Sequence, residues 1–321
     1  MSKVIGVAFS DLHLANWKQF NDKGQRLEIA NSAVTQILRA SIKYDCPMLF
    51  TGDLNDHPKH MDNIVMNLLS QLCVSLRFAD KTIIGINGNH DFHTKSTQAN
   101  RALGYMHHLD RMGAPFTCID YSYYDCSLYR VHGIPYINGN VDFKEALNIT
   151  ITNRSKSKGN ILLIHTDLPG ALEPDGREVG TAENIDTTVK KLFSKFDIVL
   201  CGHIHKHQKL GKNTFMIGAP MEQRRSDSGT KAGYILIYDD YTIKHISLNL
   251  PGFKYFNAGE EHPEDENFWI ELPKPMGEIE VTDALKFDVK ADRGKLAKNF
   301  LKAKGIKNKT KLDLLTSYLN D

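Results

Sequence analysis

The chain has 321 residues, of which 41% are hydrophobic and 24% are charged, and its formal net charge is +2. A chain of this length can bury a large core, as one domain or as one domain with an appendage. The nearly balanced charge excludes a strongly basic nucleic-acid-binding protein but leaves room for a local basic patch.

Cysteine usage and the apolar runs favour a cytoplasmic protein. The five cysteines form no Cys-x-x-Cys pair, and their odd number fits reduced thiols. The apolar run after Lys3 is too short for a signal peptide. No run approaches the roughly 20 apolar residues that a membrane span needs. We therefore expect a soluble protein without a membrane segment.

The first half of the sequence alternates short apolar runs with segments of helical periodicity. Apolar residues at three- and four-residue steps predict helices, and the short runs predict strands. The expected strands are Val4–Ser10, Met48–Thr51 and Thr82–Asn87, and the expected helices are Gly24–Tyr44, Asp62–Phe78 and Thr97–Met112. This alternation predicts a layered α/β domain.

The second half is richer in β-structure. Its expected strands are Ser127–Tyr136, Asn160–His165 and Asp197–Cys201, and its expected helices are Asp142–Ile151 and Asp186–Phe196. The loop Thr166–Gly180 contains Pro, Gly and acidic residues, so we expect it to be exposed. Three closing runs are expected to form an antiparallel set: Thr214–Ile217, Gly233–Tyr238 and Thr242–Leu248.

The composition changes after Pro251, which divides the chain into three expected parts. These are a main domain over residues 1–255, an acidic, proline-punctuated linker or strap over 256–282, and a lysine-rich helix–loop–helix appendage over 283–321. The appendage has two short amphipathic segments, Lys295–Lys304 and Lys311–Leu319. Gly305 lies between them, where a helix is expected to stop.

Five strand ends carry side chains that bind metals. They are Asp11 with His13, Asp53, Asn89 with His90, His165, and His203 with His205. Taken singly, each is more often a capped turn, a core residue or a surface residue. It is not expected by chance that all five groups directly follow apolar runs. Because strand ends gather along one edge of an α/β sheet, these residues are expected to converge.

The residue types indicate a pair of divalent cations. Two cations about 3.5–4 Å apart need a ligand that touches both, and a carboxylate does this best. Asp53 is the natural bridge. Mixed Asp, Asn and His ligands suit manganese, iron or zinc better than magnesium alone. We expect manganese, with magnesium, iron and zinc as alternatives.

The five segments resemble the signatures of the calcineurin-like metallophosphoesterases. They are Asp11-Leu12-His13, Gly52-Asp53-Leu54-Asn55-Asp56, Gly88-Asn89-His90-Asp91, His165 and Gly202-His203-Ile204-His205. The resemblance implies a four-layer α/β/β/α sandwich with a binuclear metal centre at one edge. It implies that one metal is held by Asp11, His13, Asp53 and His205, and the other by Asp53, Asn89, His165 and His203.

The same resemblance implies a hydrolytic mechanism. The two metals would polarise the phosphoryl oxygens and activate a water for in-line attack. His90 would donate a proton to the leaving group, and Asp56 would orient and charge that imidazole. A turn cap is the alternative for Asp56. Asp91 either supports the ligands or caps a helix.

Within this superfamily, the sequence is similar to the SbcD-type nuclease subunit of DNA double-strand-break repair, including its phage recombination counterparts. The similar stretches are Asp11–Leu14, Gly52–Asp56, Ile217–Pro220 and Gly233–Leu236. Ala15 and Asn55 stand where that branch has Gly and Phe. His57-Pro58 stands where protein Ser/Thr phosphatases carry Arg-Gly, which argues against that class.

This similarity implies a DNA exo/endonuclease that works with an SbcC-type coiled-coil ABC ATPase in repair or recombination, and it implies a homodimer. Arg224 and Arg225 either contact a DNA phosphate or are a solvated loop pair. The segment Lys295–Leu319 grips the ATPase, binds DNA or packs on the main domain. The alternatives are a small-substrate phosphodiesterase, for instance on cyclic nucleotides, and a binding scaffold without catalysis.

Overall fold

The computed structural model describes residues 2–16, 25–57, 60–92, 104–137, 140–179, 185 and 187–253. The expected linker over 256–282 and the expected appendage over 283–321 lie outside the described residues, as does the first half of the expected helix Thr97–Met112. Within the described ranges, no helix has both the length and the apolar content that crossing a membrane requires.

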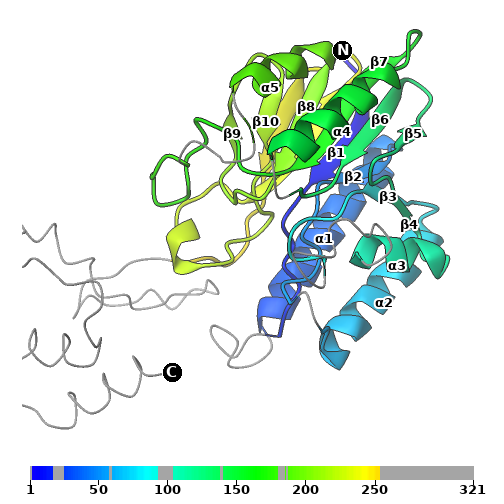
Figure 1. Cartoon of the computed structure of the whole chain (residues 1–321). Helices are drawn as coiled ribbons and strands as arrows, with labels where there is room; N and C mark the ends of the chain where they lie inside the picture. The colour runs from blue at the N-terminus through cyan, green and yellow to red at the C-terminus, as the bar shows by residue number, and fades with distance from the viewer. Residues whose placement is uncertain are drawn as a thin grey trace, which may run out of the picture. The chain divides into compact units, whose positions relative to one another are not determined.

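Two mixed β-sheets form the centre of the described structure (Figure 1). The first has the strand order β12-β11-β1-β2-β3-β4. In it β1 to β4 run parallel, and β11 and β12 continue beyond β1 in antiparallel pairing. The strands are β1 (Val4–Phe9), β2 (Met48–Phe50), β3 (Ile83–Gly85), β4 (Phe116–Cys118), β11 (Gly233–Tyr238) and β12 (Ile243–Ser247).

The second sheet has the strand order β5-β6-β7-β8-β10-β9. Its four inner strands are parallel, and both outer strands pair antiparallel to them. The strands are β5 (Tyr123–Asp125), β6 (Tyr129–Ile134), β7 (Gly159–His165), β8 (Ile198–Gly202), β9 (Gln208–Lys209) and β10 (Thr214–Met216).

Helices cover the outer face of each sheet, which gives four layers (Figure 1). On the first sheet lie α1 (Gln25–Tyr44), α2 (Asn63–Phe78) and the short α3 (Tyr105–Arg111). On the second lie α4 (Asn140–Thr152) and α5 (Thr187–Leu192), the latter followed by the 3₁₀ turn Phe193–Lys195. The expected α/β/β/α sandwich is confirmed.

The alternation of side chains along β7 shows why its continuous apolar run fits this arrangement. Ile161 and Leu163 point into the core between the two sheets, and Leu162 and Ile164 point into the core under α4 and α5. All four side chains are fully buried. A strand covered on both faces needs apolar residues at every position rather than at every second one.

One expectation about the second half is wrong, and another holds only in part: the loop after His165 is exposed at Gly170, Leu172 and residues 175–178 but not throughout. The run expected to begin an antiparallel set, Thr214–Ile217, contributes β10, which pairs parallel to β8 in the second sheet. Only β11 and β12 form the expected antiparallel pair. The loop after His165 is not simply exposed, because Leu168 and Ala171 are fully buried against the second sheet. Their apolar side chains draw this polar loop onto the domain.

The two sheets are tied together by the buried side chain of Tyr129 on β6. Its hydroxyl donates a hydrogen bond of 3.0 Å to the carbonyl of Ile5 on β1. We predict that Tyr129→Phe lowers the free energy of unfolding by about 1–3 kcal/mol, because the buried carbonyl loses its partner. Urea unfolding measures this, with the exposed Tyr124→Phe as the matched control. Equal stability of the two variants would contradict the assigned role.

Candidate metal centre

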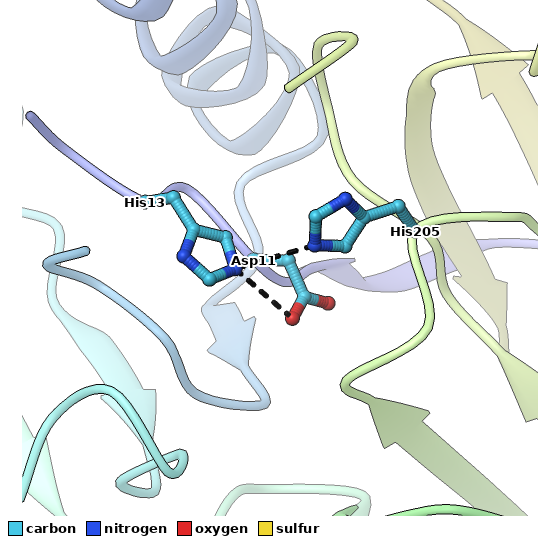
Figure 2. A group of neighbouring side chains, drawn as sticks. All are labelled: Asp11, His13 and His205. Carbon is cyan, nitrogen blue, oxygen red and sulfur yellow. Dashed lines mark hydrogen bonds and ion pairs between the residues drawn. The ribbon is translucent and has the colours of Figure 1, made fainter. Parts of the chain in front are cut away.

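The strand ends of both sheets deliver the predicted ligands to one edge of the sandwich. The residues follow β1, β2 and β3 in the first sheet and lie at the ends of β7 and β8 in the second. Their ligand atoms form overlapping groups within 4.8 Å. The groups are Asp11, His13 and His205 (Figure 2), then Asp53, His165 and His203, and then His13, Asp53 and His90.

Two imidazoles face each other in the first group. The Nε2 atoms of His13 and His205 lie 3.3 Å apart (Figure 2). The Nδ1 atom of His13 lies 2.9 Å from Asp56, and that of His205 lies 3.0 Å from Asp227. Each carboxylate accepts an N–H, so a neutral ring keeps its lone pair on Nε2. Two lone pairs therefore meet, and a cation bound by both nitrogens would satisfy them.

The second group repeats this arrangement. Nε2 of His165 lies 3.3 Å from Nδ1 of His203, and the Oδ1 atom of Asn89 lies 3.0 and 2.9 Å from these nitrogens. The far nitrogen of His165 donates to the carbonyl of Thr51 at 2.7 Å, and that of His203 lies 3.3 Å from Asp167. The nitrogens left for a ligand are Nε2 of His165 and Nδ1 of His203.

The carboxylate of Asp53 lies between the two imidazole pairs. Its Oδ2 atom is 3.5 Å from Nε2 of His13 and 3.3 Å from Nε2 of His165. Its Oδ1 atom accepts the backbone N–H of His90 at 2.8 Å. One oxygen is thus fixed by the protein and the other faces both pairs, which is the placement that a bridging ligand requires.

The donor set fits two divalent cations. The seven predicted ligands provide carboxylates, an amide oxygen and four imidazoles, and the structure brings all seven together. The observation that indicates a bound cation is the close approach of the imidazole nitrogens in each pair. Two imidazole nitrogens that each lie about 2.0–2.1 Å from the same cation are separated by nearly the distance seen between the nitrogens of each pair. The assignment of each residue to one metal or the other stays a prediction.

Several of these residues have a strained backbone. Asp11, His13, Asp53 and His203 have φ angles of 51°, 42°, 60° and 94°. Residues other than glycine rarely enter this region, which costs on the order of 1–3 kcal/mol per residue. Such strain persists only where the surrounding structure imposes it. Here the strand ends and their hydrogen bonds turn the side chains toward one another.

Gly88 allows the two ligand loops to touch. A Cβ atom at this position would lie 2.1 Å from Oδ1 of Asp53. The buried carboxylate of Asp91 then joins the loops, accepting the N–H groups of Gly88 and Asp53 at 2.8 Å and that of Leu54 at 2.9 Å. Of the two roles open for Asp91, these contacts favour support of the ligands over a helix cap.

In the predicted catalytic pair, His90 contacts both the main chain and the carboxylate of Asp56. Nδ1 of His90 donates to the backbone carbonyl of Asp56 at 2.7 Å, whereas the carboxylate of Asp56 is 3.8 Å away. That carboxylate also holds His13. Asp56 therefore orients His90 through its main chain and a metal ligand through its side chain. His90 is partly exposed and lines the cleft.

A cleft with a volume of about 110 Å³ opens over the centre. Of the two arginines predicted to contact DNA, Arg224 lines it and Arg225 does not, and both are exposed. The remaining lining residues come from the ligand loops, from the loop after β7 and from the turn Arg225–Asp227, and include Glu173, Pro174, Ser226 and Asp227.

Three supporting residues were not predicted from the sequence. Asp167 and Asp227 hold ligand histidines, and Gln223 donates to the carbonyls of Asp11 and Leu12 at 3.1 and 3.2 Å. Asp167 lies two residues after His165, a spacing that offered a signal. Asp227 and Gln223 lie in a polar loop whose pattern gave none.

The charged groups of the centre shift one another's pKa values. Burial lowers the pKa of His165, but the Asp53 carboxylate outweighs it and raises the pKa to about 9. Burial also opposes protonation of His205, yet Asp227 raises its pKa above the ordinary value. Burial would raise the pKa of Asp53, but His165 and His13 hold it well below the usual range. The site thus favours a cation next to Asp53.

Comparison with known proteins gives one family match. The family model described as calcineurin-like phosphoesterase matches residues 7–207, which include all seven predicted ligands. No curated protein matches the chain. Among solved structures, a crystal structure of a hypothetical protein from Thermus thermophilus is similar at 15% identity and a TM-score of 0.37. The match covers 66% of this chain and 75% of that one.

Replacing the bridging carboxylate should remove the paired site. We predict that the wild-type chain binds two manganese ions and that Asp53→Asn binds at most one, because the shared negative charge is lost. Isothermal titration with elemental analysis measures the stoichiometry. Asp62→Asn, a change at an exposed residue before α2, is the control and should still bind two. A folded Asp53→Asn protein with two ions would refute the bridge.

Metal affinity should depend on pH through His165. Its raised pKa means that the nitrogen carries a proton at neutral pH, and a metal must displace that proton. Affinity should therefore rise with pH, by about tenfold per pH unit for one released proton, and level off near the pKa of about 9. Titrations in buffers of different ionisation enthalpy count the released protons. An affinity that is constant from about pH 6.5 to about pH 8.5 would contradict this.

Proposed function

The chain belongs to the calcineurin-like phosphoesterase family, and we propose that it is a two-metal phosphodiesterase that cleaves DNA. Membership of the family makes the protein a metal-dependent phosphoester hydrolase. The observation that carries the proposal is the Asp53 carboxylate between two pairs of facing imidazoles. DNA as the substrate, and manganese as the metal, are proposals that go further.

The protein's own groups divide the work of hydrolysis. Asp11, His13 and His205 with Asp53 would hold one cation, and Asn89, His165 and His203 with Asp53 the other. When bound, the cations supply Lewis acidity to the phosphoryl oxygens and lower the pKa of a nucleophilic water. The carboxylates of Asp56, Asp167 and Asp227 keep the ligand rings oriented, so that little reorganisation is needed during the reaction.

His90 is the proposed proton donor to the leaving oxygen. The carbonyl of Asp56 occupies its Nδ1, which leaves Nε2 for the substrate. The carboxylate of Asp56 lies 3.8 Å from the ring. The ring also lies edge-on to His13, with centroids 4.7 Å apart, so the donor lies beside the metal ligands. These contacts support the proposed role of His90 as a proton donor that is not itself a required ligand.

A diester suits the cleft better than a protein-bound monoester. His57 follows Asp56 where protein Ser/Thr phosphatases carry an arginine, and its side chain is not among those that line the cleft. Arg224 is a cation on the cleft wall, and it can pair with one backbone phosphate. The cleft has a volume of only about 110 Å³ and is open to solvent, so we propose that one strand of the substrate lies across its mouth.

The loop after β10 gives further support to the nuclease proposal. Its sequence, from Ile217-Gly218-Ala219-Pro220 onward, is similar to that of SbcD-type nucleases. In the structure this loop carries Gln223 and Asp227 behind the ligands Asp11 and His205. Part of the sequence that is similar to the nuclease branch therefore forms the loop that supports the metal ligands.

We further propose that the protein acts as a cytoplasmic homodimer with an SbcC-type coiled-coil ATPase in DNA repair or recombination. The outer face of α2 supports the homodimer, because Ile64, Val74 and Phe78 are 54%, 51% and 90% exposed there. The five cysteines are free, as a reducing compartment requires. The expected ATPase-binding segment Lys295–Leu319 lies outside the described residues.

Cleavage assays with manganese test the substrate and the proton donor together. We predict that the chain degrades linear DNA with a higher kcat/KM than cyclic nucleotides or a bis-nitrophenyl diester. His90→Ala should lower kcat on DNA by about 10²–10⁴-fold and leave two ions bound, because a general acid contributes about that much. His108→Ala, at an exposed position on α3, is the control.

Two outcomes would count against these proposals. Faster hydrolysis of cyclic nucleotides than of DNA would assign the alternative function of a small-substrate phosphodiesterase. Full activity of His90→Ala with metal bound would remove the acid role of this residue. Metal binding without hydrolysis of any of these substrates would indicate a scaffold that has lost catalysis.

A further inference from the structure

A second group of metal-type side chains lies at the edge of the first sheet. His107, Cys118 and Asp120 each offer one ligand atom, and these atoms lie within 4.8 Å of one another. None of the three lines the cleft or belongs to the predicted centre. We propose that these residues bind one zinc ion, which joins α3 and β4 to the loop that carries Asn89 and His90.

The backbone of the site is held in place before any ion binds. Cys118 ends β4, and its N–H donates to the carboxylate of Asp110 on α3 at 3.0 Å. His107 lies three residues before Asp110, so both side chains project from the same side of α3, toward β4. Asp120 follows β4 and pairs with Gly133 in β6. The three ligands therefore come from segments that the fold already fixes.

The ring of His107 has an unsatisfied nitrogen that faces this group. Its Nε2 atom is buried and finds no hydrogen-bond partner among the described residues, and it lies 3.9 Å from Oδ2 of Asp120. Leaving a buried polar atom without a partner costs about 1–3 kcal/mol. Coordination of a cation by this nitrogen would remove the cost.

Asp120 brings a buried negative charge to the same point. Its side chain is fully buried, and it accepts the backbone N–H of Asn87 at 3.0 Å and the side-chain amide of Asn87 at 2.7 Å. These donors are neutral. A buried carboxylate is stabilised further by a full positive charge, and a metal ion supplies one.

The chemistry of the three ligands selects a thiophilic ion. Thiolate, imidazole and carboxylate together suit zinc, whereas magnesium and calcium prefer oxygen ligands only. Three protein ligands leave one position for water. As the sulfur–metal bond forms, the thiol of Cys118 gives its proton to solvent. Burial raises the pKa of this thiol, with Asp120 adding to the effect, so the thiolate forms only with the ion.

Asn87 connects the group to the catalytic loop. Its side-chain nitrogen donates to Asp120 and Cys118, and its side-chain oxygen accepts the N–H of Met106 at the start of α3. The next residues along the chain are Gly88, Asn89 and His90. An ion on Asp120 and Cys118 would hold Asn87 and therefore steady the loop that carries a predicted ligand and the predicted acid. The inference does not depend on the substrate.

Cobalt substitution distinguishes this site from the centre in the cleft. The seven predicted ligands of that centre include no cysteine, so a thiolate-to-cobalt charge-transfer band reports the second site alone. We expect chelator-treated full-length protein to develop this band on titration with Co²⁺ and to lose it when Zn²⁺ is added. Asp53→Asn, which disrupts the paired centre, should keep the band.

Variants identify the ligands. Cys118→Ser should abolish the band, and Cys73→Ser, at a half-buried cysteine on α2, should retain it. His107→Gln should weaken cobalt binding by at least about tenfold, as loss of a direct ligand should cost no less than loss of a supporting contact. Circular dichroism checks that each variant is folded. No band in the wild-type chain, or an unchanged band in Cys118→Ser or His107→Gln, would overturn the proposal.

Discussion

The metal centre depends on two contacts between imidazole nitrogens, each 3.3 Å long, on either side of Asp53. In every one of these four rings the opposite nitrogen is already held, three times by a carboxylate and once by the carbonyl of Thr51. The inner nitrogens then point their lone pairs at each other, and only positive charge relieves the repulsion. A cation bound between the two nitrogens of each pair would supply that charge.

The architecture of the sandwich imposes this arrangement of the four rings. Neither sheet carries a complete centre, since Asp11 and Asp53 follow strands of the first sheet, whereas His165 ends β7 and His203 follows β8 in the second. The core between the sheets fixes their separation, and the left-handed backbone at four ligand positions turns the side chains inward. Folding energy is thus used to hold charged groups in place, which is the preorganisation that electrostatic catalysis requires.

The sequence could predict what lies directly along the chain. Each ligand follows a buried apolar run, so the strand ends, a layered α/β domain and the set of ligand candidates could be predicted from the order of residue types, whereas the four-layer sandwich was implied by the resemblance to the family. The partner of a strand could not, because the short run of β10 pairs as well with a parallel neighbour as with an antiparallel one. Contacts between residues that are distant in the sequence could not be predicted either. Asp227 holds His205 from a loop without a pattern, and His90 is oriented by a carbonyl, which every residue has.

Anomalous diffraction from crystals grown with manganese tests the central claim most directly. The account predicts two anomalous peaks about 3.5–4 Å apart on opposite sides of the Asp53 carboxylate, one beside His13 and His205 and the other beside His165 and His203. A single peak, or two peaks too far apart to share Asp53, would contradict it.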